Sequence, residues 1–370
     1  MPLTIKQVTV YQLAMQLKTP FKTAHDVTWQ RPLSLLKITF TNGIEGFGEV
    51  ASFADAAYTA ETHAISLATL AQLIPASIGL TIDDPQAFAS WLAPQTPWSF
   101  AKAAFEMAIW DGFGKLNQQS LATMLGGRGA TVKVGIALGV ADSERQLQTD
   151  VAAAVAQGYQ RIKLKLNPTT PLAWLQQIVA AHPTILFSAD ANASWTPRDM
   201  AKIQALGQMG FYLLEQPFGA DAWAAHFALQ KQLPQLKISL DESLNNLVDV
   251  KTAITGPVGA LTLKQGKLGG ITATAKAITL ANTAAILPWI GGMLSSGVGR
   301  AADLALATLP NANVFPSDSS ASERYFERDI IMEHPQIIAG NLPVPTQPGL
   351  GVTIDWSAVT QLLVDQKEYN

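Results

Sequence analysis

Five short apolar runs decide the fold of this chain: RIKLKL (161–166), ILFSAD (185–190), YLLEQP (212–217), KISLDES (237–243) and ALTLKQG (260–266). Each run has the length of a strand buried in a sheet, and each carries a charged residue at or beside its end. Stretches with helical spacing separate the runs, at 172–181, 197–206, 222–232 and 248–254. Short apolar strands that alternate with helices predict a parallel sheet covered by those helices.

The same rhythm extends in both directions along the chain. Further strands are expected at 132–138, 284–288 and 313–316, and further helices at 143–156, 271–282 and 299–309. About eight strands at this spacing predict an α/β fold of the (β/α)-barrel type. An open doubly wound sheet is the alternative. No G-x-G-x-x-G motif follows the first strand, which weakens the dinucleotide-binding version of that alternative.

The residues before the barrel have a different pattern. Strands are expected at 5–17, 33–41 and 44–50, and the Asn42-Gly43 pair between the last two predicts a hairpin turn. Helical spacing follows at 59–73, 85–92 and 99–116. Strands followed by helices predict an α+β domain at 1–128, ahead of a barrel domain at 129–318. The segment 319–370, punctuated by Ser and Pro, is expected to return to the first domain.

Composition excludes several classes of protein. Of the 370 residues 48% are apolar and 14% charged, which predicts a large buried core and argues against disorder. A net charge of −3 without basic runs argues against a nucleic-acid partner. The chain has no cysteine, so disulfides and thiolate metal sites are ruled out. Neither a signal peptide nor a membrane span is expected, and a cytoplasmic protein is predicted.

The charged residues at the strand ends form a series. Lys165, Asp190, Glu215, Asp241 and Lys264 follow one another at intervals of 23 to 26 residues, or one strand–helix unit each. Parallel barrel strands end on the same face, where barrel enzymes carry their active sites. A single charge at a strand end is more often a helix cap or a solvated group. The five together predict one pocket surrounded by charged side chains.

These residue types suit metal-assisted removal of a proton. Asp190, Glu215 and Asp241 would repel one another strongly without a cation, and carboxylate oxygens suit Mg²⁺ or Mn²⁺. Lys165 and Lys264 flank the carboxylates, so they are expected to face each other across the pocket. A lysine near a dication and a second lysine has a lowered pKa and acts as a base near neutral pH. The pattern predicts an enzyme that removes a proton from the carbon beside a carboxylate.

Two neighbouring charges bear on these positions. Glu242 directly follows Asp241 and competes with it as a ligand, although strand alternation predicts that only one of the two points inward. Lys163 lies two residues before Lys165 and is expected to share its inward direction at another layer of the barrel.

The motifs around these residues resemble the enolase superfamily, specifically its muconate-lactonizing branch. The resemblance covers nearly the whole chain, including GFGE at 46–49 and AKAAFEMAIWD at 101–111. Lys-x-Lys at 163–165, DAN at 190–192, EQP at 215–217, DES at 241–243 and Lys264 match the branch in order and spacing. GGML at 291–294, GRA at 299–301 and SASERYF at 320–326 are most similar to a group of o-succinylbenzoate synthases and N-acylamino acid racemases.

The resemblance implies a modified (β/α)8 TIM barrel of the (β/α)7β type with an N-terminal α+β capping domain. It implies that Asp190, Glu215 and Asp241 bind Mg²⁺ or Mn²⁺, with Lys165 as the general base and Lys264 on the other face of the substrate. The loop 17–29 matches the capping loop that covers the pocket and excludes water. Contacts to the substrate are expected from Lys163, Asn192, Met293, Ser295 and His25.

The first expected activity is that of o-succinylbenzoate synthase, a hydro-lyase that dehydrates 2-succinyl-6-hydroxy-2,4-cyclohexadiene-1-carboxylate in menaquinone biosynthesis. The alternative is an N-acylamino acid (N-succinylamino acid) racemase, followed by dipeptide epimerase and muconate cycloisomerase. The resemblance also implies a small-molecule carboxylate substrate and a homo-oligomer. At three positions the chain differs from this group, which often has Glu, Arg and Ser where this chain has Ser295, Lys267 and Ala137. Because of these differences, the resemblance does not decide which substrate the protein uses.

Two other classes predict different residues. A non-catalytic barrel that only binds a ligand predicts a broken carboxylate triad or lost lysines, and all five residues are present. A flavin- or phosphate-dependent barrel has no use for the carboxylate triad.

Overall fold

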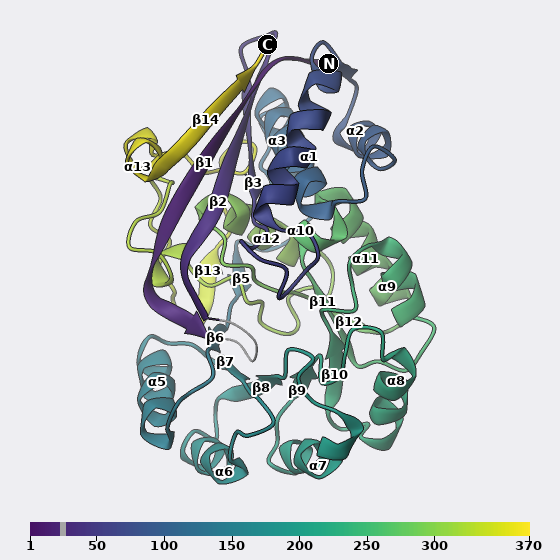
Figure 1. The fold of residues 1–370 in the computed structure, drawn as a ribbon, viewed down its shortest axis with the longest axis vertical. Coiled ribbons are helices and arrows are strands. Elements are labelled where there is room, and N and C mark those ends of the chain that lie inside the picture. The colour runs from purple at the N-terminus through teal and green to yellow at the C-terminus, as the bar shows by residue number, and fades with distance from the viewer. Residues whose placement is uncertain (23–26) are drawn as a thin grey trace.

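The computed structural model describes residues 1–22 and 27–370, which form an N-terminal domain and a barrel (Figure 1). The N-terminal domain is an antiparallel sheet with helices packed against it, and the barrel lies below it in the view of Figure 1. His25, an expected substrate contact, lies outside the described residues. None of the helices in these two ranges is long and apolar enough to cross a membrane.

The N-terminal sheet has the strand order β14-β1-β2-β3, with β4 paired to β1. The elements of this domain are β1 (Leu3–Lys22), β2 (Val27–Phe40), β3 (Glu45–Val50), α1 (His63–Ser77), β4 (Thr81–Ile82), α2 (Pro85–Leu92), α3 (Ser99–Asn117) and α4 (Leu121–Met124). The turn predicted at Asn42-Gly43 is confirmed: Gly43 has φ +84° and donates its N–H to Phe40 O. That left-handed conformation favours glycine.

Helix α3 packs closely against β3. Gly46 and Gly48 of the strand face the helix, and a Cβ atom there would lie 2.0 Å from Ala108 O and 1.9 Å from Ala104 O. Only glycine allows this approach. The close contact fixes the position of β3, and therefore of Glu49, relative to α3.

In the described part of the chain, seven parallel strands form the barrel sheet, and strands that follow one another in the chain are neighbours in the sheet. The strands are β6 (Ile136–Leu138), β7 (Arg161–Lys165), β8 (Leu186–Asp190), β9 (Leu213–Glu215), β10 (Lys237–Leu240), β11 (Ala260–Leu263) and β12 (Leu287–Ile290). The helices are α5 (Glu144–Ala156), α6 (Leu172–Ala181), η1 (Pro197–Asp199), α7 (Met200–Gln208), α8 (Trp223–Gln232), α9 (Leu247–Ala253), α10 (Gln265–Leu268), α11 (Ile271–Thr283) and α12 (Gly297–Ala307). The predicted modified barrel with an N-terminal α+β domain is confirmed.

The prediction of an eighth strand at 313–316 is wrong, because the described residues form no strand there. Asn311 has a left-handed φ of +61°, and Pro316 has no N–H to donate to a ladder. Ser317 and Asp318 close the barrel instead. Ser317 N donates to Lys133 O and Asp318 N donates to Ile290 O, both at 3.0 Å. This closure brings the Asp318 side chain to the wall of the barrel.

Two strand boundaries also differ from expectation. The strand expected at 132–138 is split, because β5 (Thr131–Lys133) pairs antiparallel with β13 (Asn341–Pro343) and only β6 joins the barrel. The strand expected at 284–288 begins at Leu287, since α11 continues to Thr283 and Ala285 has a left-handed φ of +55°.

The chain after Asp318 runs back to the N-terminal sheet. It passes through η2 (Ser322–Arg324), β13 and α13 (Trp356–Leu362), and then forms β14 (Leu363–Tyr369). Strand β14 pairs antiparallel with β1, from Leu13↔Leu363 to Val8↔Tyr369 (Figure 1). The first and last strands of the chain are therefore neighbours in one sheet.

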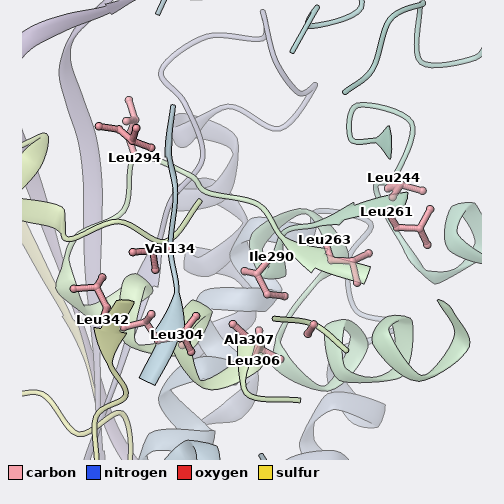
Figure 2. Packing of buried hydrophobic residues seen from close by; sticks show 14 of the residues in the cluster. Val134, Leu244, Leu261, Leu263, Ile290, Leu294, Leu304, Leu306, Ala307 and Leu342 are labelled. Carbon is pink, nitrogen blue, oxygen red and sulfur yellow. The ribbon is translucent and has the colours of Figure 1, made fainter. Parts of the chain in front are cut away.

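One hydrophobic cluster connects the barrel strands with the helices around them, and Figure 2 shows part of it. Leu263 of β11 and Ile290 of β12 are fully buried in this cluster together with Leu306 of α12. Leu263 and Ile290 directly precede Lys264 and Gly291. Dense packing of these residues therefore holds the strand ends in place.

Candidate active site

The ends of strands β7 to β11 carry the five expected residues into one buried cluster. Strand register places Lys165 beside Asp190, and Asp190 beside Glu215. Lys165 Nζ lies 2.9 Å from Asp190 Oδ2, and Lys264 Nζ lies 2.7 Å from Asp241 Oδ2. None of the five side chains is more than 9% exposed. The structure brings the whole predicted set together.

Lys163 lies among three carboxylates. Its Nζ is 2.5 Å from Asp318 Oδ2, 2.9 Å from Glu215 Oε2 and 3.5 Å from Asp190 Oδ2. Burial works against its charge, but the three carboxylates together raise the pKa of Lys163 well above its ordinary value. Lys163 is therefore a permanent cation in the wall of the site, and it faces the same cavity as Lys165.

Asp318 was not singled out from the sequence. It pairs with Arg161 Nη2 at 2.5 Å as well as with Lys163. Burial alone would raise its pKa, but Arg161 and Lys163 hold the pKa of Asp318 well below its usual range. No regular strand leads into Asp318, so the spacing that revealed the other carboxylates carried no signal for this one.

The carboxylates repel one another across the cluster. Burial, followed by the charges of Asp190 and Asp241, raises the pKa of Glu215 to about 8. Glu215 Oε1 is buried and has no hydrogen-bond partner among the described residues. Burial also opposes the charge of Asp190, but Lys165 and Lys163 lower the pKa of Asp190 below its usual value. Of the three carboxylates Asp190, Glu215 and Asp241, Glu215 is therefore the one whose negative charge the nearby lysines stabilise least.

The donor set fits a divalent cation, although the side chains are not gathered around one. Within residues 1–22 and 27–370, no three His, Asp or Glu side chains are grouped closely enough to hold a metal ion. The ammonium groups of Lys163, Lys165 and Lys264 pair with the carboxylates instead. Three buried carboxylates with one unpaired oxygen remain an all-oxygen donor set of the kind that Mg²⁺ and Mn²⁺ prefer.

Lys267 is a second lysine that contacts Asp241. Its Nζ donates to Asp241 O at 2.5 Å and lies 3.2 Å from Asp241 Oδ1. Burial lowers the pKa of Lys267. The negative charge of Asp241 raises this pKa and the positive charge of Lys264 lowers it, and the net shift is downward. Although burial opposes its charge, the two lysines hold the pKa of Asp241 well below its usual range.

Asn192 connects Lys165 to Glu242. Lys165 Nζ donates to Asn192 Oδ1 at 2.7 Å, and Asn192 Nδ2 donates to Glu242 Oε1 at 3.1 Å. Glu242 lines the cavity, and the Asp241 carboxylate contacts Lys264 and Tyr58, which also line it. Both side chains turn toward the site, so the expectation that only one of them does is wrong. Strand β10 ends at Leu240, and the alternation of a strand does not apply beyond that residue.

Tyr58 of the N-terminal domain also enters the site, and sequence reasoning missed it. Its hydroxyl donates to Asp241 Oδ1 at 2.8 Å and accepts from Lys264 Nζ at 2.7 Å. Burial and the charge of Asp241 raise the pKa of Tyr58 well above its ordinary value, so the hydroxyl stays protonated. A single tyrosine in an irregular loop has no periodic signal in the sequence.

The loop that carries Tyr58, residues 51–62, is held at both ends. Arg31 donates to Ala51 O and, at 2.6 Å, to Ser52 O. Glu61 accepts hydrogen bonds from Phe100 N and Ala101 N at the start of α3. Both anchors are buried, so the loop is fixed over the barrel.

A cavity of about 150 Å³ lies between these residues. Its lining includes the polar groups of Lys165, Lys264, Lys163 and Asn192 and the apolar side chains of Phe21, Phe53, Met293 and Tyr325. Ser295 does not line this cavity, which counts against its expected contact with a substrate. The Ser295 N–H donates to Met293 O at 2.5 Å. The cavity therefore suits a small molecule with a charged end and an apolar body.

Two family models match the chain. One is described as mandelate racemase / muconate lactonizing enzyme, N-terminal domain, and matches residues 5–126. The other is described as enolase C-terminal domain-like and matches residues 146–358. The chain belongs to the enolase superfamily. The model that matches the N-terminal residues agrees with the muconate-lactonizing branch that the motifs indicated.

Known members of the enolase superfamily are similar over nearly the full length of the chain. An o-succinylbenzoate synthase of Listeria innocua is 36% identical over 92% of this chain and 91% of its own. An N-succinylamino acid racemase of Thermus thermophilus is 34% identical over 96% of both chains. The crystal structure of an enolase-superfamily member from Listeria innocua superposes with a TM-score of 0.94 at 33% identity, over 99% of each chain.

Proposed function

We propose that this enolase-superfamily member is an o-succinylbenzoate synthase, a hydro-lyase acting on a small-molecule carboxylate in the cytoplasm. The observation that carries the proposal is that Lys165 and Lys264 line one cavity and each pairs with a buried carboxylate. Similarity to a synthase over most of the chain supports it. A homo-oligomer is part of the same proposal.

In this proposal Lys165 moves the proton. As a free amine, its Nζ takes the proton from the carbon beside the substrate carboxylate, and the electron pair of the C–H bond moves onto the carboxylate to give an enediolate. That pair then returns to form a ring double bond while the bond to the neighbouring hydroxyl breaks. The proton on Lys165 Nζ passes to the departing hydroxyl, which leaves as water.

The other residues of the site stabilise and orient the substrate. Lys264, as an ammonium group in the same cavity, would stabilise the negative charge that develops on the substrate. Lys163 is a permanent cation next to Lys165, and Asn192 holds the Lys165 amino group through its side-chain oxygen. Met293 is one of the apolar side chains that line the cavity, where the ring and its substituent would pack.

We infer that Asp190, Glu215 and Asp241 hold Mg²⁺ or Mn²⁺. When bound, the ion supplies positive charge that stabilises the enediolate. For these side chains to serve as ligands, Asp190 must exchange its contact with Lys165, and Asp241 its contact with Lys264. The exchange would release both amino groups toward the cavity, where the proposed chemistry needs them.

A second candidate is N-succinylamino acid racemase, which one observation favours. Lys264 lines the same cavity as Lys165, so a proton removed by one lysine and returned by the other would invert the carbon between them. The same arrangement serves an elimination in which Lys264 remains a cation. The similarity to a racemase is also extensive.

A side-by-side assay of the purified protein tests the proposal. We expect efficient dehydration of 2-succinyl-6-hydroxy-2,4-cyclohexadiene-1-carboxylate, and slower or no racemization of N-succinylamino acids. Racemization with a higher kcat/KM than dehydration would overturn the synthase assignment and favour the second candidate. Activity toward neither substrate would contradict both.

A further inference from the structure

Strand β14 is an edge strand that the other described residues leave uncovered. Its first six residues, Leu363 to Glu368, are all exposed, although side chains of a strand alternate between the two faces of a sheet. Within the described residues, β1 is the only strand that pairs with it. Figure 1 shows β14 along the outer side of the N-terminal sheet. A row of backbone N–H and C=O groups on that side has no strand partner.

The edge is not blocked by the helix that precedes it. Trp356 of α13 packs against Tyr11 of β1, with ring centroids 5.4 Å apart. Tyr11 is paired with Gln366, so α13 lies over a face of the sheet and leaves the edge free. Trp356, Leu363 and Val364 are 40%, 37% and 67% exposed, which adds apolar surface beside the edge.

The sequence of β14 is self-complementary when two copies run antiparallel and Gln366 lies opposite itself. Asp365 of each copy then faces Lys367 of the other, and Leu363 faces Tyr369, all on the same face. Cross-strand ion pairs and apolar pairs of this kind stabilise antiparallel sheets. Val364 and Glu368 pair on the opposite face. Every ion pair occurs twice because of the two-fold symmetry.

The charges on β14 have a pattern that permits this pairing. Edge strands that avoid pairing often carry lysines or a bulge. Here the one irregularity against β1 lies at its beginning, between Gln12 and Leu13, and the pairs from Asp365 to Tyr369 are regular. A row of like charges would repel a second copy, whereas Asp365 and Lys367 of opposite sign attract one.

We propose that the outer edge of β14 pairs antiparallel with β14 of a second copy of this chain, about a two-fold axis at Gln366. The two N-terminal sheets become one continuous sheet in the order β3-β2-β1-β14-β14-β1-β2-β3. Leu363 of one copy packs against Tyr369 of the other, at the edge of the core that Tyr369 already contacts. The interface lies on the N-terminal sheet, and the cavity of each copy stays accessible.

Disulfide trapping tests the register, because the natural chain has no cysteine. Under mild oxidation, we expect Gln366→Cys to form a covalent dimer, since that residue faces itself. Lys367→Cys alone should not, because it faces Asp365. A mixture of Asp365→Cys and Lys367→Cys should form a cross-linked dimer. Equal trapping of Gln366→Cys and of a distant surface control, Gln95→Cys, would overturn the proposal.

Charge exchange provides the second test, read as mass against concentration in sedimentation equilibrium. We expect a dimer for the natural chain, and a dissociation constant raised roughly tenfold or more for Lys367→Asp, which places two like charges opposite each other twice. The double variant Asp365→Lys with Lys367→Asp should restore the dimer. A monomer at all concentrations, or an assembly that is the same in all three proteins, would overturn the proposal.

Discussion

The hydroxyl oxygen of Tyr58 lies 2.7 Å from Lys264 Nζ, so a loop of the N-terminal domain touches one of the two barrel lysines. The same hydroxyl donates to both carboxylate oxygens of Asp241, at 2.8 Å and 2.9 Å. Tyr58 therefore bridges a proposed metal ligand and the lysine proposed to face the enediolate. Because the loop is anchored by Arg31 and Glu61, this bridge is a property of the folded N-terminal domain.

Tyr58→Phe should lower kcat for dehydration roughly tenfold, because partly buried hydrogen bonds to Lys264 and Asp241 are lost without a change of shape. Steady-state kinetics would separate the change in kcat from the change in KM. Tyr325→Phe is the matched control, since Tyr325 lines the same cavity but is not bonded to Lys264 or Asp241. Equal effects of the two substitutions would contradict a specific role for the Tyr58 hydroxyl.

Lys165→Ala should reduce exchange of the substrate α-proton with deuterated solvent by about a hundredfold or more, because it removes the proposed base. Proton NMR of the substrate measures the exchange. Calorimetric titration with Mn²⁺ should show binding retained, since the three carboxylates remain. Lys231→Ala, on the exposed surface of α8, controls for a general effect of losing a lysine. Substantial exchange in Lys165→Ala would remove this residue from the proposed mechanism.

Chelation should abolish dehydration, and addition of Mg²⁺ or Mn²⁺ should restore it, because the proposed enediolate needs a counter-charge. Glu215→Gln should weaken Mn²⁺ binding more than tenfold in calorimetric titration, since it removes one of three anionic ligands. Glu144→Gln, in the first turn of α5 and outside the cavity lining, provides the control. Full activity in the presence of EDTA would contradict the role of the metal.

The strand-end residues were predictable because their signal is periodic. Lys165, Asp190, Glu215, Asp241 and Lys264 each end or directly follow a regular barrel strand, so spacing alone indicated that they would meet. Seven of the eight expected strands formed for the same reason. The roles assigned to the five residues came from chemistry and resemblance, and they remain predictions.

The residues that were missed reach the site through irregular backbone. Asp318 follows a segment broken by Asn311 and Pro316, and Tyr58 projects from a loop of the other domain. Glu242 turns into the cavity because β10 has already ended. Side-chain direction after a strand or within a loop depends on tertiary contacts, which a local pattern does not contain.

Asp318→Asn should lower the free energy of unfolding by about 3 to 5 kcal/mol, because Arg161 and Lys163 are buried cations that both pair with Asp318. Urea denaturation followed by circular dichroism measures the change. Asp142→Asn breaks the exposed pair with Lys22 and should change stability by less than about 1 kcal/mol. Similar losses of unfolding free energy in both variants would contradict the prediction that the buried ion pairs of Asp318 stabilise the fold more than an exposed pair does.

Glu49 joins the N-terminal domain to the barrel and should make stability depend on pH. The buried carboxyl group accepts hydrogen bonds from Ser296 N and Gly299 N at the start of α12, both at 3.1 Å. Burial raises the pKa of Glu49 from its ordinary value of 4.5 to about 7, although these hydrogen bonds act in the opposite direction. The folded protein therefore holds this proton more tightly than the unfolded chain does.

A carboxyl group with a raised pKa stabilises the folded state fully below about pH 4.5, and the stabilisation is lost as the pH rises through about 7. A shift of this size corresponds to about 3 kcal/mol. Glu49→Gln does not titrate, so its unfolding free energy should rise relative to the natural chain by up to that amount between about pH 4.5 and pH 7. Urea denaturation of both proteins across this range measures the difference. A difference that stays constant with pH would contradict the raised pKa of Glu49.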